Sequence, residues 1–251
     1  MVGELDWQVA VLDRLDKWIE ANGDGFKTAE PFPHAVIDGL FETDFLNLLL
    51  GEFPDVGDPI WQVSDDDGIQ IKLRSNWKGE LDIPPSIRDV VHFLNSGQFL
   101  RRITALTGIE KLISDPYYTG GGLNCILPGG LLDVHCDGNW HDAMAVHRRL
   151  NLILFLNEGW KPEWHGALEF WDRDMSECVK LIEPEMNRVL VFETHDYSYH
   201  GHPNPLACPP DRSRRSLILY YYTSVQRPAD QIMVEQPHRA LWRKKSLSPL
   251  S

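Results

Sequence analysis

The chain has 251 residues, of which 43% are hydrophobic and 24% charged, and its formal net charge is −13. This length and balance predict a single domain with one sizeable core and some additions. The negative charge repels phosphate backbones and anionic membranes, which argues against a nucleic-acid substrate and mildly favours neutral or cationic small substrates. The chain shows neither a leader-like start nor an apolar run long enough to span a bilayer. We therefore expect no membrane association and a cytoplasmic location.

Cysteine usage indicates neither a disulfide framework nor a zinc ribbon. Cys125, Cys136, Cys178 and Cys208 are widely spaced, and no two of them form a C-x-x-C pair. We interpret all four as reduced thiols.

The first part of the chain favours helices. Residues 4 to 22 carry apolar side chains at three- and four-residue steps, which predicts an amphipathic helix that ends at Asn22-Gly23. In the next helix we expect Phe45, Leu48 and Leu49 to face the core. The remaining elements expected here are a strand within 31–41, that helix at 42–53, a loop at 55–68, a strand at 69–75 and two helices within 83–108.

After about residue 112 the pattern changes to short apolar or alternating runs separated by turn residues. The expected strands lie in LNCIL, LLDVHCD, RLNLILFLN, GALEFWD, CVKLIEP, RVLVFET and RRSLILYYYT. So many short strands predict an antiparallel sandwich or jelly roll. The expected fold is therefore mainly β with N-terminal helices: a support region at 1–112, a β core at 113–224 and an extension at 225–251, all within one domain.

A candidate metal site begins at His135-Cys136-Asp137. In a strand, residues i and i+2 point to the same side, so His135 and Asp137 can hold one ion while Cys136 points away. Two histidines and one carboxylate on one face suit Fe(II) that must leave other positions open for dioxygen. None of the other histidines begins a His-x-Asp or His-x-Glu.

The third ligand must come from elsewhere in the chain. A turn-rich segment after the apolar run RVLVF contains His195, His200 and His202, and each is a candidate. His141 would need a helical chain to join Asp137, which conflicts with a strand at 135–137. It is at most a neighbouring or substrate-loop residue.

The order of these motifs, GGGLNCILPGG, HCD, LNLILFLNEGW, HGALEFWD, VLVFET, YHGHPNP and RRSLILYYYT, resembles the Fe(II)- and 2-oxoglutarate-dependent dioxygenases. The resemblance is greatest to their prolyl-4-hydroxylase-like branch, and it covers roughly residues 31 to 224. It implies a double-stranded β-helix, a cupin-like jelly roll, with helices packed on its larger sheet. It also implies that His135, Asp137 and His200 are the metal and catalytic residues, with His202 as the main rival of His200.

The resemblance further implies a reaction and its cofactors. Fe(II) and 2-oxoglutarate would be used with O2 to hydroxylate a C–H bond, with release of succinate and CO2 and with ascorbate as reductant. The substrate would be a prolyl residue, an amino acid or a related small metabolite, free or in a peptide. The alternative from another class is a cupin-like jelly roll that binds a metal as a sensor without turnover. Nothing in the sequence predicts the oligomeric state.

In this family a basic residue on the last core strand binds the far carboxylate of 2-oxoglutarate. The R-x-S pattern matches Arg214 and Ser216, whereas Arg215 falls on the opposite face of the strand. A guanidinium suits a carboxylate because it donates two parallel hydrogen bonds. By the same alternation, the other residues expected to line the co-substrate cavity are Tyr220, Asn151 and Phe155.

Three further residues are expected to border the substrate. Trp77 lies in a polar loop and Trp140 directly after the metal motif, so both are candidates for a substrate groove. Arg74, on the strand LRS, is expected to reach the site as well.

Overall fold

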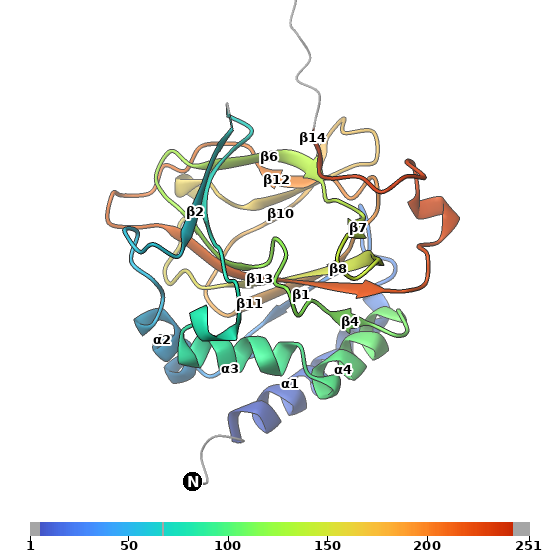
Figure 1. The fold of residues 1–251 in the computed structure, drawn as a ribbon, viewed down its shortest axis with the longest axis horizontal. Helices are drawn as coiled ribbons and strands as arrows, with labels where there is room; N and C mark the ends of the chain where they lie inside the picture. Colours follow the sequence, from blue (N-terminus) through green and yellow to red (C-terminus); the bar gives the residue numbers. More distant parts are fainter. Residues whose placement is uncertain (1–5, 67, 243–251) are drawn as a thin grey trace, which may run out of the picture.

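A computed structural model describes residues 6–66 and 68–242, in which helices lie against one face of a rolled antiparallel sheet (Figure 1). The helices are α1 (Asp6–Asn22), α2 (Thr43–Gly51), α3 (Pro85–Leu94) and α4 (Gly97–Thr107). Short 3-10 turns follow at Gly23–Gly25, Glu80–Asp82, Pro162–Trp164 and Ala229–Gln231. No helix in the described ranges is both long and apolar enough to cross a membrane.

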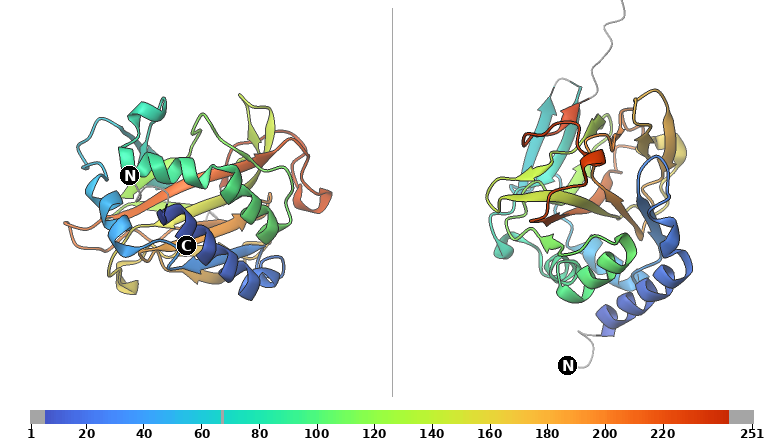
Figure 2. Two further views of the ribbon diagram at one scale, coloured as in Figure 1. Left: turned by 90° about the horizontal axis from the view of Figure 1, so that it is seen from below. Right: turned by 90° about the vertical axis from the view of Figure 1, so that its right-hand side faces the viewer.

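The strands are β1 (His34–Asp38), β2 (Trp61–Asp66), β3 (Gln70–Ser75), β4 (Ile113–Ser114), β5 (Gly122–Ile126), β6 (Leu131–Cys136), β7 (Trp140–His141), β8 (Val146–Phe155), β9 (Leu168–Trp171), β10 (Cys178–Ile182), β11 (Arg188–Glu193), β12 (His200–His202), β13 (Arg214–Thr223) and β14 (Leu241–Trp242). Their order is β1-β11-β8-β13-β5-β3-β6-β12-β9-β10, and β14 pairs with β6. This path curls one half of the sheet over the other, so the predicted mainly β jelly roll with N-terminal helices is confirmed (Figure 2).

The helices form because their apolar positions share one face and their ends are capped. Pro85 opens α3, the Ser96 hydroxyl accepts a hydrogen bond from the Phe99 amide in α4, and Gly108 ends α4 in a left-handed conformation. In α2 the buried residues are Leu46 and Leu49. The expectation that Leu48 faces the core is wrong, because its side chain is 60% exposed on the other side of the helix.

The strands β8 and β13 run side by side through the middle of the sheet, and each presents two different faces. On the face toward the helices they carry leucines such as Leu152 and Leu219, which belong to the main hydrophobic core. The opposite face points into the interior of the roll. Because successive side chains of a strand point to opposite faces, every second residue of β8 and β13 packs in the core and the residues between them face the interior of the roll.

The expected loop at 55–68 is wrong in part, because β2 occupies Trp61–Asp66 and pairs with β3 as a hairpin. Most of the β2 side chains are exposed, so the strand lacks the apolar face that would have identified it in the sequence.

Candidate active site

Two histidines meet where β6 and β12 pair. His135 and His200 are register partners, and the centroids of their imidazole rings lie 4.6 Å apart. This close pairing requires glycine at position 201, because a Cβ atom there would lie 2.7 Å from the carbonyl oxygen of Asp133. The His-Gly dipeptide thus has a packing reason: only glycine lets β12 approach β6 at this point.

The carboxylate of Asp137 completes a cluster with these two rings. Its Oδ1 lies 3.6 Å from Nε2 of His135, and its Oδ2 lies 3.6 Å from Nε2 of His200. One ligand atom from each residue can be chosen so that all three lie within 4.8 Å of one another. The 3.6 Å separations are too long for hydrogen bonds, but they suit donors that share one metal ion at roughly 2.0–2.2 Å from each.

Both imidazoles are held so that Nε2 faces the carboxylate. The Nδ1 atoms of His135 and His200 lie 2.9 Å from the carbonyl oxygens of Asp133 and Ser198, respectively. If each Nδ1 carries the proton and donates to its carbonyl, each Nε2 has a free lone pair toward the cluster. The two ligand candidates are therefore oriented by the same device, a carbonyl two residues earlier in the chain.

The charge states in the cluster also suit a metal. Burial alone would raise the pKa of Asp137, but Arg148 and the two histidines hold that pKa well below its usual value. The amide of Asn151 donates a hydrogen bond to the same carboxylate. Burial, with the nearby His135, lowers the pKa of His200 to about 4, so this imidazole is neutral near pH 7. An ionised carboxylate and a neutral imidazole are the forms that bind metal ions.

A small polar pocket of about 80 Å³ extends from the cluster into the roll. Arg214 and Ser216 line it, and the guanidinium Nε of Arg214 donates to the carbonyl of Gly166 at 2.7 Å. The hydroxyl of Ser216 is buried, and no hydrogen-bond partner for it occurs in the described ranges. Buried polar groups are normally paired, so an arginine and an unpaired hydroxyl together suit an anionic ligand. We call this space the inner pocket.

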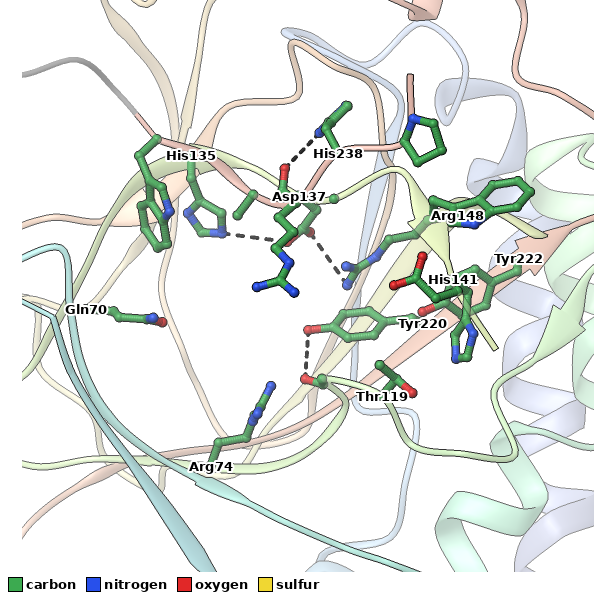
Figure 3. A pocket seen from close by; sticks show the side chains of 18 of the residues that line it. Gln70, Arg74, Thr119, His135, Asp137, His141, Arg148, Tyr220, Tyr222 and His238 are labelled. Atoms are coloured by element: carbon green, nitrogen blue, oxygen red, sulfur yellow. Dashed lines mark hydrogen bonds and ion pairs between the residues drawn. The ribbon is translucent and has the colours of Figure 1, made fainter. Parts of the chain in front are cut away.

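A second, wider cavity of about 760 Å³ shares part of its wall with the inner pocket. His135 and Asp137 line both cavities, and so does Tyr220, whose hydroxyl donates to the carbonyl of Gly120. Figure 3 shows Arg74, Arg148 and Tyr220 pointing into the space beside Asp137. We call this cavity the outer pocket. The cluster of His135, Asp137 and His200 thus borders both a small inner pocket and a wide outer one.

Comparison with known proteins supports this arrangement. Residues 121–222 match the family model of the 2OG-Fe(II) oxygenase superfamily. This segment is thus similar to a 2OG-Fe(II) oxygenase domain. The match includes β5, the three cluster residues and most of β13, and it supports the expected class of 2-oxoglutarate-dependent non-haem iron oxygenases.

Individual relatives are more distant. A 93-residue segment is 30% identical to mouse "Prolyl 3-hydroxylase OGFOD1", covering 35% of this chain and 17% of the mouse protein. In fold, the chain is similar to a Pseudomonas putida prolyl-4-hydroxylase, with a TM-score of 0.58, 19% identity and coverage of 82% of this chain and 98% of that one. A Trichoplax adhaerens prolyl hydroxylase, solved with a hypoxia inducible factor peptide, gives a TM-score of 0.52 at 14% identity, with coverages of 88% and 93%. The fold of this chain is thus similar to that of these two prolyl hydroxylases.

The other candidate histidines occupy different places around the cluster. His202 lies on the inner pocket, and both of its ring nitrogens lack hydrogen-bond partners within the described part of the chain. His195 lies near Glu193, with 3.6 Å between Nε2 and the carboxylate. His141 contacts Asp115 at 3.2 Å and lines the outer pocket. His200 is the histidine of the third-ligand segment that the structure brings to the cluster with His135 and Asp137.

The two neighbouring arginines of β13 point to opposite sides, as alternation predicts. Arg214 is 4% exposed and lines the inner pocket. Arg215 lies over the ring of Phe53, 5.0 Å from its centroid, on the side of α2. Of this pair, Arg214 is the residue that faces the candidate co-substrate space.

Two of the expected site residues, Phe155 and Trp77, have mainly apolar surroundings. Phe155 shares a strand face with Asn151, is the register partner of Ser216, and belongs to an apolar cluster, with the guanidinium of Arg214 5.1 Å from its ring. Ile153 lies between them on the pocket wall. Trp77 is 6% exposed within the main core and packs edge-on against Tyr118. Neither residue is among those that line the two pockets, and their roles at the co-substrate and the substrate stay predictions.

The outer pocket includes both of the remaining candidates, Arg74 and Trp140. It also includes residues that the sequence interpretation missed. Lys72 follows from the strand period, because it is two residues before Arg74 on β3. No sequence pattern indicated Trp242. It lies in β14, and its ring centroid is 4.6 Å from that of His135. Arg148, 3.8 Å from the Asp137 carboxylate, lies at the start of β8, where a surface charge would be the ordinary interpretation.

Proposed function

We propose that this chain is an Fe(II)- and 2-oxoglutarate-dependent hydroxylase that inserts oxygen into an unactivated C–H bond and releases succinate and CO2. One oxygen atom of O2 enters the substrate and the other enters succinate, so the reaction balances without a further oxidant. The observation that carries the proposal is that one cluster, His135, Asp137 and His200, borders both a small cationic pocket and a wide outer pocket.

In this proposal the three cluster residues hold the iron. Each histidine would bind through Nε2, and Asp137 would bind through its carboxylate. When bound, the iron supplies the activation of dioxygen, because three protein ligands on one face leave the opposite face free. Asn151 and Arg148 keep the Asp137 carboxylate ionised and oriented through a hydrogen bond and a charge contact.

The inner pocket would hold 2-oxoglutarate. Arg214 and Ser216 would bind the carboxylate farther from the iron, the first by charge-assisted hydrogen bonds and the second through its unpaired hydroxyl. Tyr220 would form a wall between the two pockets, since it lines both. The pocket is small and enclosed by strands, so it orients the co-substrate with little freedom.

The outer pocket would hold the substrate. Its volume of about 760 Å³ suits a small metabolite or a short segment of a peptide. The names of the relatives, a prolyl 3-hydroxylase and prolyl-4-hydroxylases, support a prolyl residue, an amino acid or a related small metabolite as the substrate class. Trp140 and Arg74 would contact it from the pocket wall.

The proposal is tested by incubating the protein with Fe(II), ascorbate as reductant, 2-oxoglutarate and pooled peptides and metabolites. We expect succinate to form and some component to gain the mass of one oxygen atom, only when 2-oxoglutarate is present. Metal binding without any succinate would instead support a cupin-like sensor that binds metal without turnover. Product formation that is independent of 2-oxoglutarate would contradict the proposed co-substrate.

A further inference from the structure

The walls of the outer pocket carry a charge opposite to that of the whole molecule. The chain has a formal net charge of −13, which favours neutral or cationic ligands at long range. Yet the lysine and arginine residues that line the outer pocket outnumber its carboxylates. The cations are Lys72, Arg74, Arg148 and Arg239, and the carboxylates are Asp137 and Asp142. A local cationic surface on an acidic protein needs a specific explanation.

Two of these cations are already used by the site itself. Arg148 lies 3.8 Å from Asp137, donates to Asn151 and stacks on the ring of Tyr220 at 3.3 Å. Lys72 lines both pockets and is therefore available to the co-substrate together with Arg214. Since one carboxylate of 2-oxoglutarate would bind at the iron and the other at Arg214, the co-substrate needs no more cations than these.

Arg74 has no such partner. Its guanidinium donates to the neutral Gln62 side chain at 2.8 Å, and no ion pair of Arg74 with a carboxylate occurs in the described ranges. A Cβ atom added at Gly120 would lie 3.5 Å from Nη1 of Arg74 and 3.4 Å from the ring of Tyr220. The guanidinium therefore lies beside Tyr220, and Figure 3 shows it directed toward the space below Asp137.

Arg239 approaches the same cavity from the far end of the chain. The segment that carries it is tied down because the amide of His238 donates to the Asn139 side chain and β14 pairs with β6. The Arg239 side chain is exposed and, among the residues that the structure describes, forms no ion pair. Two arginines from distant parts of the sequence thus line one cavity without a compensating carboxylate of their own.

The positive charges of the outer pocket also affect the pKa of Lys72. Lys72 has its pKa lowered to about 8, first by burial and next by the positive charge of Arg74. An anion bound between Arg74 and Arg239 would relieve this repulsion, because opposite charges at short range favour the charged form of a lysine.

Resting on the proposed function, we propose that the substrate carries a carboxylate or another oxyanion, which Arg74 and Arg239 bind in the outer pocket. The guanidinium groups would then fix the end of the substrate remote from the reacting C–H bond and select acids over their neutral analogues. The role is one of substrate binding and specificity.

The test uses a library of N-acetyl amino acids and short prolyl peptides, each supplied both as the free acid and as the primary amide. Each compound is incubated with the iron-loaded protein and 2-oxoglutarate, and both the mass gain of one oxygen and kcat/KM are measured. The variants are R74Q/R239Q and the charge-conserving R74K/R239K. R101Q serves as the matched control, because Arg101 is an exposed arginine on α4 that does not line the pocket.

We expect acids to be hydroxylated at least about tenfold better than their amides, through a lower KM, as partly exposed charge pairs allow. The preference should disappear in R74Q/R239Q, persist largely in R74K/R239K and be unchanged in R101Q. Equal or better use of amides, or a preference for acids that survives R74Q/R239Q, would overturn the proposal. Succinate release without hydroxylation of any acid would overturn it too, whereas no 2-oxoglutarate-dependent succinate at all would refute the proposed function instead.

Discussion

The two faces of β8 and β13 differ in chemistry although they belong to the same strands. The face toward the helices carries leucines that are fully or almost fully buried in the main core, among them Leu150, Leu152 and Leu219. The interior face of the same strands carries Asn151 and Arg214, which line the inner pocket. Alternation along a strand lets one segment stabilise the fold on one side and hold polar groups on the other.

The two faces also differ in how much they stabilise the folded state. Buried polar atoms without partners destabilise a folded protein, and within the described residues Ser216 on β13 has an atom of this kind, as does His202 on β12, which lines the same pocket. The helix-facing leucines carry no such cost. We therefore expect changes on the interior face to affect ligand binding more than stability, and changes on the other face to do the reverse.

The largest expected effect comes from the metal cluster. Asp137→Ala removes the carboxylate between His135 and His200, so we expect hydroxylation to be abolished. The stability of the fold should change far less than activity, because the site is on the interior side. Activity is measured as 2-oxoglutarate-dependent succinate formation and mass gain. Full turnover by Asp137→Ala would refute the assignment of this residue.

The opposite face is tested by Leu152→Ala. Leu152 is fully buried between the sheet and the helices, and removing such a side chain typically costs about 2–5 kcal/mol of unfolding free energy. We expect a loss of about 3 kcal/mol in chemical denaturation, with the KM for 2-oxoglutarate unchanged in the protein that remains folded. A selective loss of co-substrate binding without destabilisation would contradict the expectation that this face affects stability more than ligand binding.

Arg214 and Arg215 are adjacent on β13 but lie on opposite faces, so their alanine variants compare the two faces directly. Arg214→Ala should raise the 2-oxoglutarate concentration needed for half-maximal turnover by roughly ten- to a hundredfold, because a buried charge-assisted contact is lost. Arg215→Ala, on the Phe53 side, should leave that concentration within about twofold, as expected for a residue that does not touch the ligand. If the two variants exchanged these effects, the carboxylate-binding residue would be Arg215.

A smaller effect is expected for Lys72 on β3. Its pKa is lowered from 10.5 to about 8 by burial and by Arg74, so between pH 8 and 10.5 the unfolded chain binds the proton more tightly than the folded one. The charged lysine therefore lowers the unfolding free energy most below pH 8, and this destabilisation disappears as the pH rises to 10.5. We expect Lys72→Met to gain about 1 kcal/mol at pH 7, discounted for partial exposure, while 2-oxoglutarate binding weakens.

Denaturant titrations at pH 7, 9 and 10.5 provide the measurement for this variant. The difference in unfolding free energy between Lys72→Met and the natural chain should shrink with rising pH. A difference that grows with pH would show that the lysine is charged and stabilising in the folded state.

Local periodicity predicted much of this fold and site. The alternation in RRSLILYYYT was enough to place Arg214 and Arg215 on opposite faces, and the His-x-Asp spacing was enough to bring His135 and Asp137 together. Periodicity predicts which face of the sheet a side chain is on, but not which side chains of that face line a pocket. Phe155, on the same face as Asn151, belongs to an apolar cluster, and its place beside the co-substrate stays a prediction.

Other features depend on contacts between distant segments, which no local pattern contains. Trp242 reaches His135 because β14 adds to β6, and β2 exists because it pairs with β3. Trp77 was expected at a groove because its sequence neighbours are polar, but its ring packs against Tyr118 inside the core. Tertiary packing decides such positions, so they were open until the fold was known.

The most direct test of the account is equilibrium dialysis with Fe(II) and 2-oxoglutarate under anaerobic conditions. We predict one iron ion per chain, with 2-oxoglutarate bound only when iron is present. His200→Ala should lose iron binding, while His202→Ala, its neighbour on β12, should retain it. Full iron binding by His200→Ala, or its loss only in His202→Ala, would contradict the proposal that His135, Asp137 and His200 hold the iron.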